Sequence, residues 1–124
     1  MIASRPRILV IDREYFVALE AERILTEGLA CAVEIAMPRT FRALIEGAPF
    51  DVVVIDAALM TAERQEILQV HHQAGVGIVF TTLSSSDHNR FSGFAPSRAV
   101  RKPFVDQELL EAVRNALAQS LRTA

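Results

Sequence analysis

The sequence lacks the features that mark several large classes of protein. Its single cysteine, Cys31, cannot form a disulfide within the chain, which argues against a disulfide-rich scaffold and fits a reducing compartment. No apolar run reaches membrane-spanning length, and the N-terminal residues MIASRPR lack the apolar core of a signal peptide. The phosphate-binding patterns GxxxxGK(S/T) and GxGxxG are absent as well. We therefore expect a cytoplasmic protein that does not bind nucleotides through those motifs.

The sequence also lacks a large excess of positive or negative charge. The 13 basic and 15 acidic side chains give a net charge of −2. This balance offers no electrostatic basis for binding nucleic acid or an anionic membrane surface. Neither is expected as a direct partner.

The chain does contain short β-branched runs that alternate with helix-like stretches. The runs at 7–11, 51–55 and 77–80 are apolar on both sides, which favours strands that are covered on both faces. A weaker run covers 31–36, and 98–102 is a poor candidate for a fifth strand. The regular alternation predicts βα units.

Apolar residues at helical spacing predict the helices between these strands. Expected helices cover 14–27, 39–47, 62–73 and a last stretch that runs to Leu121. Thr61 and Asp106 are the expected N-caps of the third and the last of these helices. The serine-rich segment 84–97 contains weak helix formers, so it holds either one short helix near 86–92 or an irregular loop.

This order of strands and helices predicts one fold. Right-handed crossovers turn five βα units into a doubly wound α/β domain, with a five-stranded parallel sheet and helices on both faces. A length of 124 residues suits a single domain spanning 1–124. In such folds, sites form at the carboxyl ends of the strands.

Polar residues follow four of the five expected strands. They are Asp12, Arg13, Glu14, Asp56, Thr81, Thr82, Ser84 and Lys102. Each residue alone is weak evidence for a functional site, because an aspartate after a strand is usually a turn former and a lone lysine is usually solvated. Together they suit phosphoryl transfer to a carboxylate, which depends on positioning and on charge neutralisation.

Four segments resemble the receiver domains of bacterial two-component response regulators. They are ILVIDRE (8–14), DVVVIDAALM (51–60), IVFTTL (78–83) and RKPF (101–104). The resemblance extends over nearly the whole chain and implies a flavodoxin-like fold of the receiver type. It further implies a phosphoprotein of phosphorelay signal transduction, not an enzyme, that acts as a stand-alone domain.

The resemblance assigns roles to matching positions. Asp56 would be the phosphoacceptor and form an aspartyl phosphate, Thr82 rather than Thr81 would be the hydroxyl that contacts the phosphoryl group, and Lys102 would bind that group. The peptide bond between Lys102 and Pro103 would be cis. A histidine kinase or phosphotransfer protein would supply the phosphoryl group.

The resemblance also implies a magnesium ion and a downstream protein partner. Asp12, Asp56 and the backbone carbonyl of Ala58 would hold Mg²⁺. Output by protein–protein contact would use Arg101, Phe104, Glu111, Arg114 and Asn115.

Arg13 departs from the family, which has an acidic metal ligand at this position. Two unit charges about 4–6 Å apart interact by roughly 3–4 kcal/mol at an effective dielectric constant near 20, so an inward-pointing Arg13 would weaken Mg²⁺ binding or abolish it. Three interpretations compete: Arg13 pairs with Asp12 or Asp56, it extends to solvent, or Glu14 replaces the missing ligand. We favour the first slightly over the second.

Ala99 is a second departure, because the family has an aromatic residue three positions before the lysine. Together with Arg13 and the atypical segment 84–97 it supports an alternative, a pseudo-receiver that acts as an interaction module without phosphorylation. The retained Asp56, Thr82 and Lys102 oppose that alternative. A hydrolase with an aspartate nucleophile is a third, weaker candidate, because such enzymes usually need more length.

Overall fold

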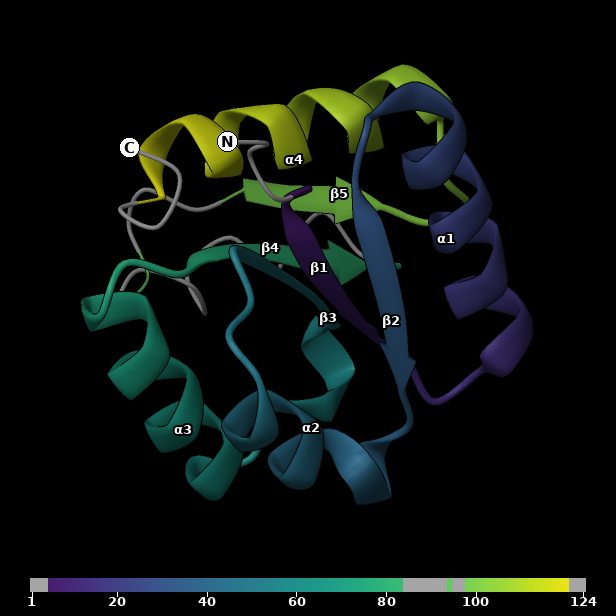
Figure 1. Ribbon diagram of the computed structural model, residues 1–124. Coiled ribbons are helices and arrows are strands. Elements are labelled where there is room, and N and C mark those ends of the chain that lie inside the picture. The colour runs from purple at the N-terminus through teal and green to yellow at the C-terminus, as the bar shows by residue number, and fades with distance from the viewer. Residues whose placement is uncertain (1–4, 84–93, 95–97, 121–124) are drawn as a thin grey trace.

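The structure, a computed structural model, describes residues 5–83, 94 and 98–120. Five parallel strands form one sheet in the order β2-β1-β3-β4-β5 (Figure 1). They are β1 (Arg7–Ile11), β2 (Ala32–Ala36), β3 (Val52–Asp56), β4 (Gly77–Thr82) and β5 (Arg98–Arg101). The predicted doubly wound parallel sheet is confirmed, including its weakest strand.

Helices connect the strands and cover the sheet. They are α1 (Tyr15–Gly28), α2 (Phe41–Gly47), α3 (Ala62–Gln73) and α4 (Asp106–Gln119), with the short 3-10 turns η1 (Pro38–Thr40) and η2 (Ala57–Leu59). The predicted helix or loop within 84–97 lies outside the described residues, apart from Phe94. None of the described helices is long and apolar enough to cross a membrane.

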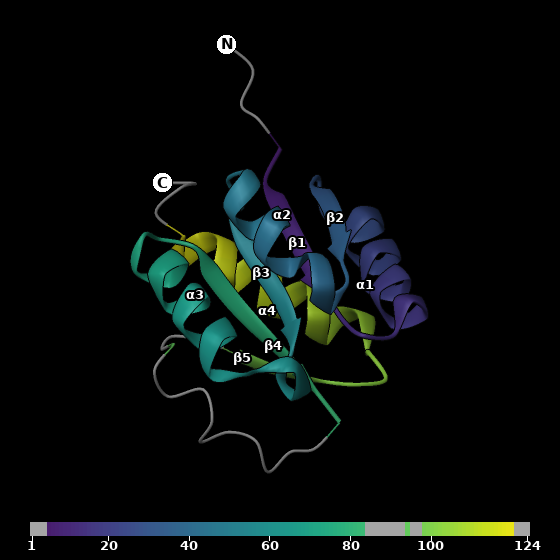
Figure 2. The same ribbon diagram turned by 90° about the horizontal axis from the view of Figure 1, so that it is seen from below.

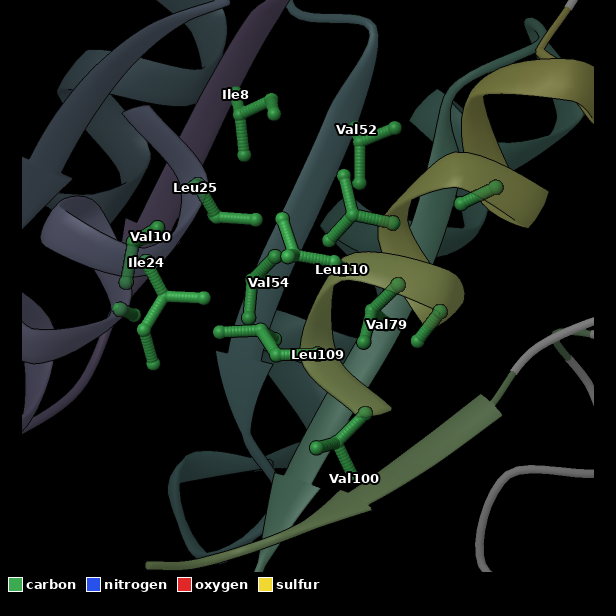
Figure 3. Packing of buried hydrophobic residues seen from close by; sticks show 14 of the residues in the cluster. Ile8, Val10, Ile24, Leu25, Val52, Val54, Val79, Val100, Leu109 and Leu110 are labelled. Carbon is green, nitrogen blue, oxygen red and sulfur yellow. The ribbon is translucent and has the colours of Figure 1, made fainter. Parts of the chain in front are cut away.

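Alternation along the strands divides the apolar core into two layers. Ile8, Val10, Val52 and Val54 face α1 and α4, where Leu109 packs among them (Figure 3). Figure 2 shows α2 and α3 on the opposite face of the sheet from α4, and a second cluster of buried apolar side chains lies on that face. All five residues of β3 are buried, because β3 lies at the centre of the sheet with helices on both sides.

The two expected helix caps have different outcomes. The side chain of Thr61 accepts a hydrogen bond from the backbone N–H of Arg64 at 3.2 Å, so this prediction is confirmed. Asp106 is wrong as a cap, because α4 begins at Asp106 itself and Val105 occupies the N-cap without a side-chain bond. A carboxylate in the first turn still interacts favourably with the positive end of the helix.

The buried leucine of α4 allows a test of the packing between helix and sheet. Leu109 has no exposed surface, so Leu109→Ala removes buried methyl groups and leaves a cavity that costs about 2–5 kcal/mol of unfolding free energy. Urea denaturation followed by circular dichroism measures this loss. Val70→Ala on the exposed side of α3 is the control and changes stability by less than about 0.5 kcal/mol. Equal losses in the two variants would contradict the assigned core.

Candidate functional site

Four strands bring polar residues to one edge of the sheet. Because the strands are parallel, their carboxyl ends meet there, and in Figure 2 the loops after β1 and β5 lie at the same edge. Asp12 follows β1 directly, Asp56 is the last residue of β3, and Thr82 is the last residue of β4. Lys102 follows β5, which is an outermost strand of the sheet and lies next to β4.

Lys102 joins two of these strand ends. Its Nζ donates hydrogen bonds to Oδ2 of Asp12 at 2.9 Å and to Oδ2 of Asp56 at 3.2 Å. The side chains of Lys102, Asp12 and Asp56 are 10%, 4% and 5% exposed, so all three charges are largely removed from water. Buried charges of this kind are tolerated only when they are paired.

The other oxygen of each carboxylate is bound by the backbone. Oδ1 of Asp12 accepts from the N–H of Glu14 at 2.8 Å, and Oδ1 of Asp56 accepts from the N–H of Ala58 at 3.0 Å. Each of these bonds closes a short turn directly after its strand. The carboxylates are therefore fixed in orientation from both sides.

The electrostatics of the site favour a charged lysine. Burial alone lowers the pKa of Lys102, but its hydrogen bond to Asp12 and the charges of Asp12 and Asp56 raise it. The net pKa lies above the ordinary value of a lysine. Lys102 is thus a stable resident cation of the site.

Thr82 lies beside Lys102 along the backbone. The N–H of Lys102 donates to the carbonyl oxygen of Thr82 at 2.8 Å, and the peptide bond between Lys102 and Pro103 is cis, as predicted. Both threonines are buried, with Thr81 in register with Asp56 and Thr82 one position further toward the edge. The role of the Thr82 hydroxyl stays a prediction.

Arg13 does not form the ion pair that the sequence suggested. Its side chain is exposed, and among the described residues none makes a hydrogen bond or ion pair with it. The favoured interpretation, a pair with Asp12 or Asp56, is therefore wrong, because Lys102 already makes both pairs. The second interpretation, a side chain that extends to solvent, agrees with the structure.

The donor set suits an ammonium better than a divalent ion. No group of three or more His, Cys, Asp or Glu side chains among the described residues is arranged to hold a metal. The two available carboxylates converge on the Lys102 ammonium, and each carboxylate oxygen already accepts a hydrogen bond. Mg²⁺ needs oxygen ligands in near-ideal octahedral geometry, so the residues present do not form a ready magnesium site.

Arg64 is a residue at this edge that the sequence did not single out. Its Nη1 donates to the carbonyl oxygen of Leu59 at 2.8 Å and so ties the first turn of α3 to η2, the turn that follows Asp56. An arginine near the start of a helix carries no sequence signal for such a contact, because its target is a backbone atom.

Comparison with solved structures shows consistent likeness to one kind of domain. The chain matches no protein-family model, and the search of curated proteins gives no match. A signal receiver domain of an HD domain-containing protein from Pseudomonas fluorescens Pf-5 superimposes with a TM-score of 0.78 at 23% identity, over 95% of this chain and 90% of that one.

Two further solved structures of receiver domains are similar to this chain. A CheY-like response regulator receiver domain protein from Methanospirillum hungatei JF-1 has a TM-score of 0.76 at 27% identity, over 98% of this chain and 100% of that one. The chemotaxis response regulator CheY4 of Vibrio cholerae has a TM-score of 0.76 at 19% identity, over 92% and 100%. The chain therefore has the fold of response regulator receiver domains over most of its length.

Proposed function

We propose that this chain receives a phosphoryl group from a histidine kinase on Asp56 and passes the signal on through protein–protein contact. The observation that carries this proposal is the buried Asp56 at the carboxyl edge of a receiver-type sheet, paired with Lys102. In this function the chain is a signalling module of a phosphorelay rather than an enzyme.

Transfer to Asp56 follows from the chemistry of the residues at the edge. An oxygen of Asp56 attacks phosphorus, the P–N bond of the phosphohistidine breaks, and the imidazole leaves with the bonding electrons. Lys102 lies within hydrogen-bond distance of Asp56 and neutralises charge on the phosphoryl oxygens. The Thr82 hydroxyl donates a further hydrogen bond to them. Mg²⁺ binds weakly or not at all, because Arg13 stands in place of an acidic ligand and the Lys102 ammonium already lies between Asp12 and Asp56.

Output contacts fit a groove between β5 and α4. The groove has a volume of about 210 Å³ and is lined by Ala99, Val100, Arg101, Glu108, Glu111 and Ala112. Alanines on both sides leave room for a side chain of a partner, and charged residues surround it. This groove overlaps the expected output surface at Arg101 and Glu111.

Phosphorylation of Asp56 is tested with a small phosphodonor. We expect intact mass spectrometry of the purified protein to show a phosphate-sized gain after incubation with phosphoramidate, and Asp56→Asn to abolish it. The control Asp51→Asn changes another buried aspartate, at the opposite end of β3, and keeps the gain in molecules that remain folded. Absence of a gain in the folded wild type under every condition would favour the phosphorylation-independent pseudo-receiver instead.

Lys102 has a structural role that can be separated from phosphorylation. Lys102→Met leaves two buried carboxylates without their shared cation, and we expect a loss of about 3–5 kcal/mol in unfolding free energy. The double variant Lys102→Met/Asp56→Asn loses less, because one of the unpaired charges is gone. Arg42→Gln removes an exposed cation that pairs with Glu46 and costs less than about 1 kcal/mol. Equal stability of the single and double Lys102 variants, measured by urea denaturation, would refute the charge argument.

A further inference from the structure

We propose that Asp56 accepts its phosphoryl group without a divalent metal ion, and that Lys102 and Arg13 supply the positive charge in its place. This inference rests on the proposed function of Asp56 as phosphoacceptor. The residues present do not match the ligands that Mg²⁺ needs. Arg13 is a charged residue at this edge whose place no other described contact explains.

A metal ion bound by Asp12 and Asp56 would need the space between their carboxylates. The ammonium of Lys102 already lies between Asp12 and Asp56, within hydrogen-bond distance of both. A divalent ion held by the same two oxygens would lie close to this ammonium and be repelled by it. The protein thus places its own cation where the carboxylates converge.

The site carries more negative than positive charge. Asp12 and Asp56 carry two negative charges against the single positive charge of Lys102. An incoming phosphoryl group adds more negative charge, which one ammonium cannot neutralise. A second cation is therefore needed at this edge.

Arg13 is placed to provide that charge. The hydrogen bond from the N–H of Glu14 to Oδ1 of Asp12 closes a turn around Arg13, so its backbone is held beside Asp12. Its side chain is exposed and is not engaged by any other described residue, so no ion pair has to break before it reaches a ligand. A guanidinium presents paired N–H groups that match phosphoryl oxygens.

The transfer step balances with phosphoramidate as the donor. An oxygen of Asp56 forms the new bond to phosphorus, and the P–N bond breaks. The nitrogen, already protonated in the donor, leaves as ammonia with the bonding electron pair. Lys102 and Arg13 neutralise phosphoryl oxygens and gain or lose no proton.

The experiment compares phosphorylation by phosphoramidate in excess Mg²⁺ and in excess chelator. We expect the wild-type rate, followed by intact mass, to differ less than about threefold between the two conditions. Arg13→Asp removes the cation and introduces a third carboxylate, so its phosphorylation rate in chelator falls by about tenfold or more and recovers with Mg²⁺. Arg13→Gln also falls in chelator but does not recover with Mg²⁺.

Arg23→Gln is the matched control. Arg23 is an exposed arginine within α1 that pairs with Glu20 and Glu27 of the same helix. The control substitution changes the net charge by the same amount as Arg13→Gln. We expect its phosphorylation rate to stay at the wild-type value both in Mg²⁺ and in chelator. Thermal melts followed by circular dichroism verify that each variant is folded.

A binding measurement tests the metal part without any turnover. Tyr15 is the single tyrosine of the chain, which has no tryptophan, and it lies two residues from Arg13. We expect Mg²⁺ titration to leave its fluorescence unchanged in the wild type and to give a saturable change in Arg13→Asp. Saturable binding by the wild type at a lower concentration than by the variant would overturn the inference.

The outcomes separate this inference from the proposed function. Wild-type phosphorylation that requires Mg²⁺ would refute the metal-free mechanism and leave Asp56 as phosphoacceptor. An Arg13→Gln variant as fast as wild type in chelator would remove Arg13 from the mechanism. No phosphorylation of folded protein in either condition would refute both proposals.

Discussion

The site depends on one ammonium group that two carboxylates share. Lys102 follows the outermost strand β5, yet it reaches Asp56 at the end of β3 and Asp12 after β1, past the intervening β4. The three charges are almost fully buried, and each would be costly to hold there alone. The contact therefore determines how the carboxyl ends of three strands are arranged, and it leaves both carboxylates oriented by one side-chain bond and one backbone bond.

Most of the fold could be predicted because it follows from local patterns. Apolar β-branched runs on both sides of a strand are possible only where helices cover both faces, which is what β1, β3 and β4 show. The same logic placed Asp56 and Lys102 at one edge, since parallel strands end together. Asp106 was misplaced by one position because a carboxylate is favourable both at the N-cap and in the first turn of a helix, so residue type alone does not separate the two.

The side-chain contacts at the edge could not be predicted in the same way. Whether Arg13 turns inward depends on whether another cation already occupies the space between the carboxylates. That cation, Lys102, lies 90 residues from Asp12 in the sequence. Distances and burial in the folded chain determine which of the two cations pairs with the carboxylates. The spacing of residues along the sequence does not predict this. The contact of Arg64 with the backbone of Leu59 is hidden for the same reason, because a carbonyl oxygen has no sequence signature.

Lys102 also connects the charged site to the groove between β5 and α4. Its backbone N–H binds the carbonyl of Thr82, so the residue that neutralises the carboxylates also ends the pairing of β4 with β5. Arg101, the neighbour of Lys102, lines the groove. Ala99 contributes no large side chain there, so in this chain the physical link between the two sites runs through the backbone of β5 and the position of Lys102 rather than through an aromatic side chain at position 99.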